Sequence, residues 1–158
     1  MNALPDKLLV IAALRRELEE NIERAAARAE QARVDATHAE ARAENDKDTR
    51  GLEQSYLARG HAARVEELEA ALVTVAGLTV ARPGPRVALG AVVTVDDDGA
   101  SARYYLAPWG GGVTLAGGIA VVTPTSPIGR ALLGKAIGDV AEVHRPGGVR
   151  EFEIVAIG

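Results

Sequence analysis

The sequence contains no cysteine, which excludes disulfide bonds and thiolate zinc sites and agrees with a reducing compartment. Its 158 residues include only one Phe, one Trp and three Tyr, so aliphatic side chains and alanine must fill any core. No run approaches the roughly 18–20 uninterrupted apolar residues of a membrane span, and no basic leader precedes the short apolar run near the N-terminus. We therefore expect a cytoplasmic protein with no membrane partner.

The charge is unevenly distributed. Residues 1–80 hold 11 Lys and Arg against 15 Asp and Glu, whereas residues 81–158 hold seven of each sign, so the formal net charge of −4 lies in the first half. Binding to duplex DNA requires a basic stripe that neutralises phosphates. The acidic first half is therefore a poor candidate for DNA binding, and the two halves are expected to be built differently.

From Asp6 to Arg42 the sequence has no glycine or proline, and apolar residues recur at steps of three or four. This spacing predicts one long helix whose seam packs against a partner helix. Pro5 and Asp6 suit the start of that helix, because proline has a helical φ and an acid favours the positive end of the helix dipole. The predicted seam residues are Ile11, Leu14, Leu18, Ile22, Ala25, Ala29, Ala32, Ala36 and Ala39.

A second helical pattern runs from about Leu52 to Ala76, although Gly60 inside it costs about 1 kcal/mol relative to alanine. Two helices joined by a short polar segment predict an antiparallel coiled-coil hairpin over residues 1–78, with an acidic tip near 44–51. The residues predicted on the packed side of the second helix are Leu52, Tyr56, Val65, Leu68, Leu72 and Val75.

The helical pattern ends at the segment Ala76–Arg86, AGLTVARPGPR, whose glycines and prolines predict a linker. Short strand-like runs separated by turns follow, which predicts a small antiparallel sheet over residues 79–158. The predicted fold class is therefore α+β, with a helical hairpin followed by a sheet domain that carries one short helix.

The single short helix of the second half is predicted within TSPIGRALLGK. Ser126 is the expected N-cap and Pro127 the first helical residue. Leu132 and Leu133 are expected to face inward, and Gly134 is expected to end the helix.

The segment Ser126–Ile157, SPIGRALLGKAIGDVAEVHRPGGVREFEIVAI, resembles the C-terminal signature of bacterial Gre-type (GreA/GreB) transcript cleavage factors. The order of a coiled coil followed by a sheet domain is also similar to that family. The resemblance implies an FKBP-like fold for residues 79–158 and a monomer that binds RNA polymerase. In this interpretation the sheet domain docks at the rim of the secondary channel and the coiled coil enters it. The partner-binding residues implied are Ser126, Pro127, Ile128, Pro146 and Gly147.

The hairpin tip of that family carries a Gly-Asp-x-x-Glu-Asn motif, whose acids help to hold the second catalytic Mg²⁺ of the polymerase. Counting back without gaps from RVEELEAAL, which resembles the end of the family's second helix, places the first family carboxylate on Glu44 and the second on Lys47. The acids nearest to the second position are Asp46 and Asp48. The predicted catalytic carboxylates are therefore Asp46, Asp48 and Glu44, with Asp46 and Asp48 as the Mg²⁺ ligands.

Mg²⁺ prefers hard oxygen ligands and is usually held by one or two protein carboxylates together with water and substrate phosphates. A chain that delivers carboxylates to another enzyme's ion needs no cofactor of its own and is not itself an enzyme. The favoured hypothesis is a factor that stimulates cleavage of backtracked RNA, and so meets the RNA 3′ end indirectly. Two alternatives stay open, namely a Gre-like inhibitor with an altered tip and a coiled-coil adaptor that does not bind polymerase.

Overall fold

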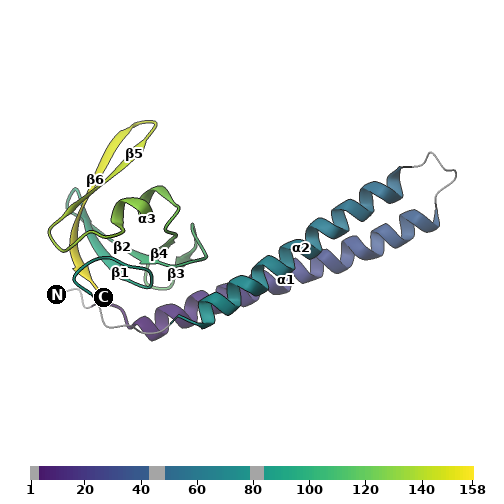
Figure 1. Cartoon of the computed structure of the whole chain (residues 1–158), viewed down its shortest axis with the longest axis horizontal. Helices are drawn as coiled ribbons and strands as arrows, with labels where there is room; N and C mark the ends of the chain where they lie inside the picture. The colour runs from purple at the N-terminus through teal and green to yellow at the C-terminus, as the bar shows by residue number, and fades with distance from the viewer. Residues whose placement is uncertain (1–3, 43–48, 79–83) are drawn as a thin grey trace. The chain divides into compact units, whose positions relative to one another are not determined.

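The computed structural model describes residues 4–42, 49–78 and 84–158. Within these residues two long helices precede a six-stranded sheet with one short helix, which confirms the predicted fold class (Figure 1). None of the described helices is apolar over a stretch that would span a lipid bilayer. The elements are α1 (Lys7–Ala41), α2 (Arg50–Ala76), β1 (Val92–Asp97), β2 (Ala100–Leu106), β3 (Thr114–Leu115), β4 (Ile119–Val122), α3 (Pro127–Leu132), β5 (Val140–Arg145) and β6 (Gly148–Ile157).

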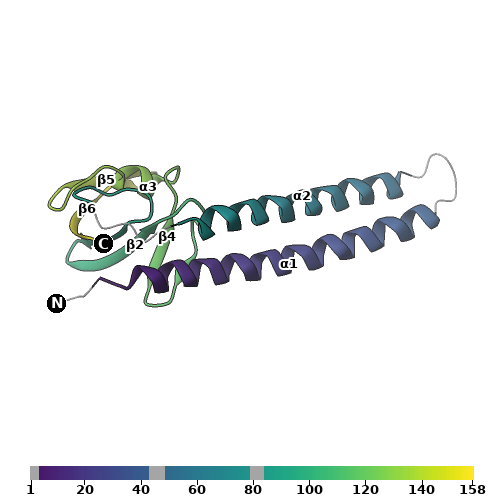
Figure 2. The same cartoon turned by 60° about the horizontal axis from the view of Figure 1, so that its bottom comes forward.

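The chain divides into two compact units. One is Arg16–Val73, which contains most of the helical hairpin, and the other combines Met1–Arg15 with Thr74–Gly158. The second unit therefore contains the sheet together with the first turns of α1 and the last residues of α2. In both views of the molecule α1 and α2 run side by side in opposite directions (Figures 1 and 2).

Helix α1 begins where its sequence provides a cap. The Asp6 carboxylate accepts a hydrogen bond of 2.9 Å from the backbone N–H of Leu8, one of the donors that a helix start leaves unpaired. At 35 residues α1 is about 52 Å long. Every predicted seam residue of α1 is buried or half-buried, which confirms the seam along its whole length.

The predicted packed side of α2 is only partly correct. Leu68 and Val75 are buried, but Leu52 is 56% exposed and Tyr56 is 62% exposed. In the first turns the buried position is instead Gly51, and the half-buried positions are Gln54 and Ser55. A Cβ on Gly51 would lie 3.5 Å from the Glu40 Cα, so the two backbones approach closely here. Because only small residues fit against α1 at this level, the larger side chains turn outward.

Gly60 gives the first testable prediction. It is exposed in the middle of α2, and a Cβ placed on it meets no atom within 4 Å. Gly60→Ala should therefore stabilise the hairpin by about 1 kcal/mol, because alanine loses less backbone entropy in a helix. Denaturant unfolding followed by helical circular dichroism measures this, with Gly51→Ala as the matched control, whose Cβ would lie 3.2 Å from Glu40 Cγ. A loss of stability in Gly60→Ala would contradict the prediction.

The strand order of the sheet is β3-β4-β2-β1-β6-β5. Neighbouring strands pair antiparallel except β2 and β4, which pair in parallel from Arg103 with Ile119 to Leu106 with Val122. The sheet is therefore mixed, and the prediction of a purely antiparallel sheet is wrong at this pair. The reason is that β3 and β4 form a short hairpin after β2. This hairpin reverses the chain, so β4 runs beside β2 in the same direction.

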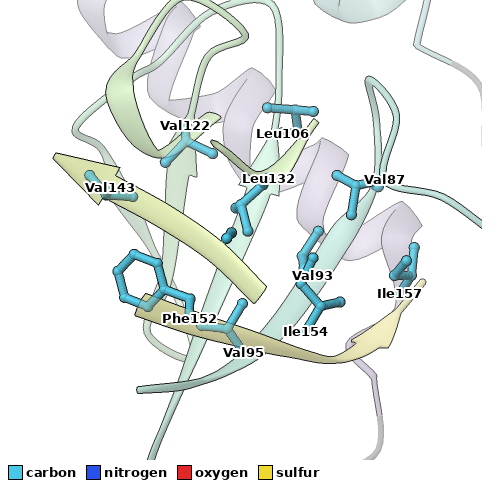
Figure 3. Close-up of a cluster of buried hydrophobic side chains, with 12 residues drawn as sticks. Val87, Val93, Val95, Leu106, Val122, Leu132, Val143, Phe152, Ile154 and Ile157 are labelled. Atoms are coloured by element: carbon cyan, nitrogen blue, oxygen red, sulfur yellow. The ribbon is translucent and has the colours of Figure 1, made fainter. Parts of the chain in front are cut away.

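One face of the sheet packs against α3. Leu132 is completely buried among side chains of the strands, including Val93, Leu106 and Ile154 (Figure 3). Ser126 caps α3 and Pro127 is in its first turn, as predicted. Leu133 is 46% exposed, so its predicted inward orientation is wrong. Leu133 is the C-cap, where the backbone leaves the helical conformation and turns the side chain outward.

The opposite face of the sheet contains Tyr105, which is fully buried and lies opposite Val92 and Val121 in the neighbouring strands. Leu14 of α1 reaches this side, because a Cβ on Gly110 would lie 2.8 Å from Leu14 Cδ1 and 3.4 Å from Val121 Cγ1. Among the described residues the Tyr105 hydroxyl has no hydrogen-bond partner. Burial raises the pKa of Tyr105 to about 12.

This raised pKa predicts a loss of stability in alkali. The unfolded chain releases the tyrosine proton near its ordinary pKa of about 10, whereas the folded chain keeps the Tyr105 proton up to a pKa of about 12. The protonated Tyr105 hydroxyl therefore makes its full contribution to the free energy of unfolding below about pH 10. That contribution is lost between about pH 10 and 12. In Tyr105→Phe the free energy of unfolding should fall less steeply over this range. Tyr56→Phe, at an exposed position, is the control, and an unchanged slope in Tyr105→Phe would contradict the prediction.

Candidate functional site

A largely apolar pocket of about 490 Å³ lies in the sheet unit, between the start of α3 and the β5–β6 hairpin. We call it the sheet-domain pocket. It takes side chains from the four strands β2, β4, β5 and β6 and from the Ser126–Ile128 segment, and Ile128 is packed against the core beneath it. Its lining residues are Tyr104, Gly111, Gly112, Ala120, Val121, Val122, Ser126, Pro127, Ile128, Val143, His144, Arg145, Pro146 and Arg150.

The Ser126–Ile128 wall is fixed by local hydrogen bonds. The Ser126 hydroxyl donates to the Thr123 carbonyl at 2.8 Å and accepts from the Gly129 N–H at 3.1 Å. The Ser126 N–H also bonds the Thr123 carbonyl at 3.0 Å. The Ser126 side chain thus links Thr123, the residue after β4, to the first turn of α3. This link holds Pro127 and Ile128 at the mouth of the pocket.

The opposite wall is the end of the β5–β6 hairpin, where Arg145 pairs with Gly148 across the turn Pro146-Gly147. Arg150 is held in this wall by the Asp97 carboxylate, which accepts hydrogen bonds from both Nε, at 2.8 Å, and Nη2. Its guanidinium also lies 5.2 Å from the centre of the Phe152 ring, as a cation–π pair. Arg150 therefore has a fixed position, with its charge balanced by Asp97.

The structure brings together four of the five predicted partner-binding residues. Ser126, Pro127, Ile128 and Pro146 line the sheet-domain pocket, while Gly147 lies in the small adjoining hollow at the hairpin turn. Sequence reasoning missed Tyr104, Arg145 and Arg150. The alternation of buried and exposed residues along β5 and β6 could have identified the two arginines as pocket residues. In each strand the arginine lies on the same face as the buried residues.

The predicted catalytic acids Glu44, Asp46 and Asp48 lie outside the described residues. Helix α1 ends at Ala41 and α2 begins at Arg50, and residues near these two ends line a second pocket of about 530 Å³. This hairpin-end pocket has both acidic and basic side chains, and it is lined by Asp35, His38, Ala39, Arg42, Arg50, Glu53 and Gln54. In the described part of the chain no three His, Asp or Glu side chains are grouped to hold a metal ion.

The first turns of α2 expose an apolar stripe formed by Leu52, Tyr56 and Leu57. The Arg59 guanidinium lies 5.7 Å from the centre of the Tyr56 ring. Packing inside the hairpin does not explain these three side chains, since α2 meets α1 through the smaller residues Gly51 and Ser55.

Comparison with known proteins agrees with this architecture. A family model described as "Transcription elongation factor, GreA/GreB, C-term" matches residues 82–158. The transcription elongation factor GreA of Methylococcus capsulatus is 39% identical over 134 residues, which cover 79% of this chain and 81% of the relative. GreA of Brucella suis is 35% identical over 136 residues, which cover 81% and 83%.

Among solved structures, GreA factor homolog 1 of Thermus thermophilus aligns at 27% identity over 91% of this chain and 94% of its own, with a TM-score of 0.40. The sequence matches are to transcription elongation factors and extend over both the helical and the sheet parts of the chain. The chain belongs to the GreA/GreB family.

Proposed function

We propose that this protein binds RNA polymerase and stimulates the polymerase to cleave backtracked RNA. The observation that carries the proposal is the pair of long antiparallel helices, of which α1 ends at Ala41 and α2 begins at Arg50, in a chain of the GreA/GreB family. In the sequence, residues 43–48 lie between these two helices. Those six residues include Glu44, Asp46 and Asp48. The chain supplies carboxylates and the polymerase supplies the catalytic centre, so the protein is not an enzyme on its own.

The sheet unit is the proposed docking part. The sheet-domain pocket is apolar, its wall at Ser126 is fixed by two hydrogen bonds of the hydroxyl, and its other wall is fixed through Arg150 and Asp97. A preformed concave apolar site binds a protruding side chain with little loss of conformational entropy. We assign Ser126, Pro127, Ile128, Pro146 and Gly147 to contact with the polymerase.

The hairpin is the proposed delivery part. Close backbone approach at Gly51 and the alanine seam of α1 keep it thin, and α1 is one uninterrupted helix. In two-metal phosphoryl chemistry the second ion activates water for attack on the phosphodiester. Asp46 and Asp48 would share that Mg²⁺ with the polymerase and orient the water, because carboxylates are the ligands that Mg²⁺ prefers.

The test uses stalled, backtracked complexes of purified bacterial RNA polymerase. The full chain should bind core polymerase in a pull-down and accelerate Mg²⁺-dependent release of short 3′ RNA fragments. Binding that slows elongation without any cleavage would instead support the inhibitor alternative. Absence of binding would refute the proposed function and favour the adaptor alternative.

A further inference from the structure

Two arginines, Arg145 and Arg150, line one wall of the otherwise largely apolar sheet-domain pocket. In strand β5 the buried residues Ala141 and Val143 alternate with exposed ones, and Arg145 continues their face. In strand β6 Arg150 pairs with Val143 and shares a face with the buried Phe152. Both arginines therefore lie on the side of the hairpin that faces the pocket, and both line it.

The acids of the same hairpin lie on its other face. Glu142 and Glu151 are directly opposite each other, both exposed, and Glu153 follows on the same face as Glu151. The β5–β6 hairpin thus separates the two signs of charge, with the positive side toward the pocket. Since like charges directly opposite each other destabilise a sheet, the arrangement is unfavourable for stability alone.

The two arginines differ in what they contact. Arg150 is paired with Asp97, whose side chain is only 10% exposed. Arg145 is exposed, and within residues 4–42, 49–78 and 84–158 no carboxylate lies within ion-pair distance of it. Arg145 lies close to Tyr104 in the pocket wall: burial raises the pKa of Tyr104, and the positive charge of Arg145 opposes that rise. The pocket therefore offers one cation whose charge is not balanced within the described chain.

We propose, on the basis of the proposed function, that Arg145 binds a carboxylate of RNA polymerase at the edge of this docking pocket, beside the apolar group that enters it. An arginine pairs with a carboxylate through two parallel hydrogen bonds, which fixes orientation as well as adding affinity. Charge complementarity selects this partner: the cavity accepts an apolar group, and Arg145 at its edge accepts an anion. A nucleic acid fits less well, because phosphates require a basic stripe and the outer face of this hairpin is acidic.

The experiment measures the affinity of the full chain for core polymerase at low and high salt. Arg145→Glu should weaken binding by about tenfold or more, and Arg145→Gln by less, because reversal adds repulsion to the lost pair. The difference between the unchanged chain and Arg145→Gln should shrink at high salt. Arg130→Glu is the matched control, since Arg130 is exposed on α3, does not line the pocket and changes the net charge equally.

Binding of Arg145→Glu within twofold of the unchanged chain would overturn the inference and leave the proposed function intact. Equal weakening by Arg130→Glu would also overturn it, because the effect would then be one of net charge. Competition by a short single-stranded RNA that requires Arg145 would show that the pocket edge binds phosphate instead of a protein carboxylate. Failure of the unchanged chain to bind polymerase would refute the proposed function itself. Thermal unfolding of each variant separates these results from misfolding.

Discussion

Replacing Asp46 and Asp48 together by asparagine should reduce the stimulation of RNA cleavage by about 100-fold and leave the affinity for polymerase nearly unchanged. Asparagine preserves the size of each side chain and removes the charge that Mg²⁺ binding needs. Misplacement of a reacting group by about 1 Å costs on the order of 100-fold in rate, and loss of the ion's ligands should cost at least as much. Binding should persist because the proposed docking pocket lies in the sheet unit.

The measurement is single-turnover cleavage in stalled complexes at saturating factor, with affinity measured separately. Glu53→Gln is the matched control: it removes an acid from the first turn of α2, where a favourable interaction with the helix dipole accounts for that acid. Full stimulation by the Asp46→Asn/Asp48→Asn variant would show that these carboxylates are not the ligands. Loss of stimulation in Glu53→Gln to the same degree would show that the hairpin end responds to any loss of charge.

Lys47 provides a further comparison in the same assay. It occupies the position of the second family carboxylate in the alignment without gaps, so Lys47→Glu adds an acid there. If Asp46 and Asp48 already supply the ligands, this substitution should change stimulation little. A large gain would mean that the native tip is mismatched, which is the inhibitor alternative.

The sequence predicted the helical hairpin because its seam in α1 is long, regular and free of glycine and proline. In α2 the same reasoning assigned Leu52 and Tyr56 to the packed side, and both are exposed. Hydrophobicity identifies a seam only where the partner leaves room for large side chains. Beside Glu40 of α1 the two backbones lie close together, and Gly51 and Ser55 occupy that place. The partner helix imposes this constraint, and the residue pattern of one helix alone does not reveal it.

The candidate pocket was predictable only in part. Ser126–Ile128 and Pro146 form a recognisable local motif, and the structure places them around one cavity. The parallel pairing of β2 with β4 depends on how the chain returns after β3, and local strand patterns do not reveal it. The contribution of Arg145 and Arg150 likewise depends on which hairpin face turns toward α3, which follows from the packing of Val143 and Phe152.

Gly129→Ala should destabilise the sheet unit by about 3 kcal/mol or more, although helix propensity alone predicts a gain of about 1 kcal/mol. A Cβ at this position would overlap the Thr123 carbonyl oxygen and lie 2.7 Å from its carbon. That carbonyl accepts from both the hydroxyl and the N–H of Ser126, so the backbone cannot withdraw without breaking the cap of α3. The substitution that stabilises α2 at Gly60 is therefore expected to act with the opposite sign in α3.

Denaturant unfolding followed by the fluorescence of Trp109, the single tryptophan, reports on the sheet unit. Gly147→Ala is the control, because a Cβ there meets no atom within 4 Å. Ser126 and Gly129 together position Pro127 and Ile128 at the pocket mouth, so any Gly129→Ala protein that still folds should also bind polymerase more weakly than the unchanged chain. A Gly129→Ala variant of native stability would mean that the Thr123 carbonyl moves freely, and that the wall of the docking pocket is not held by the hydrogen bonds assigned to it.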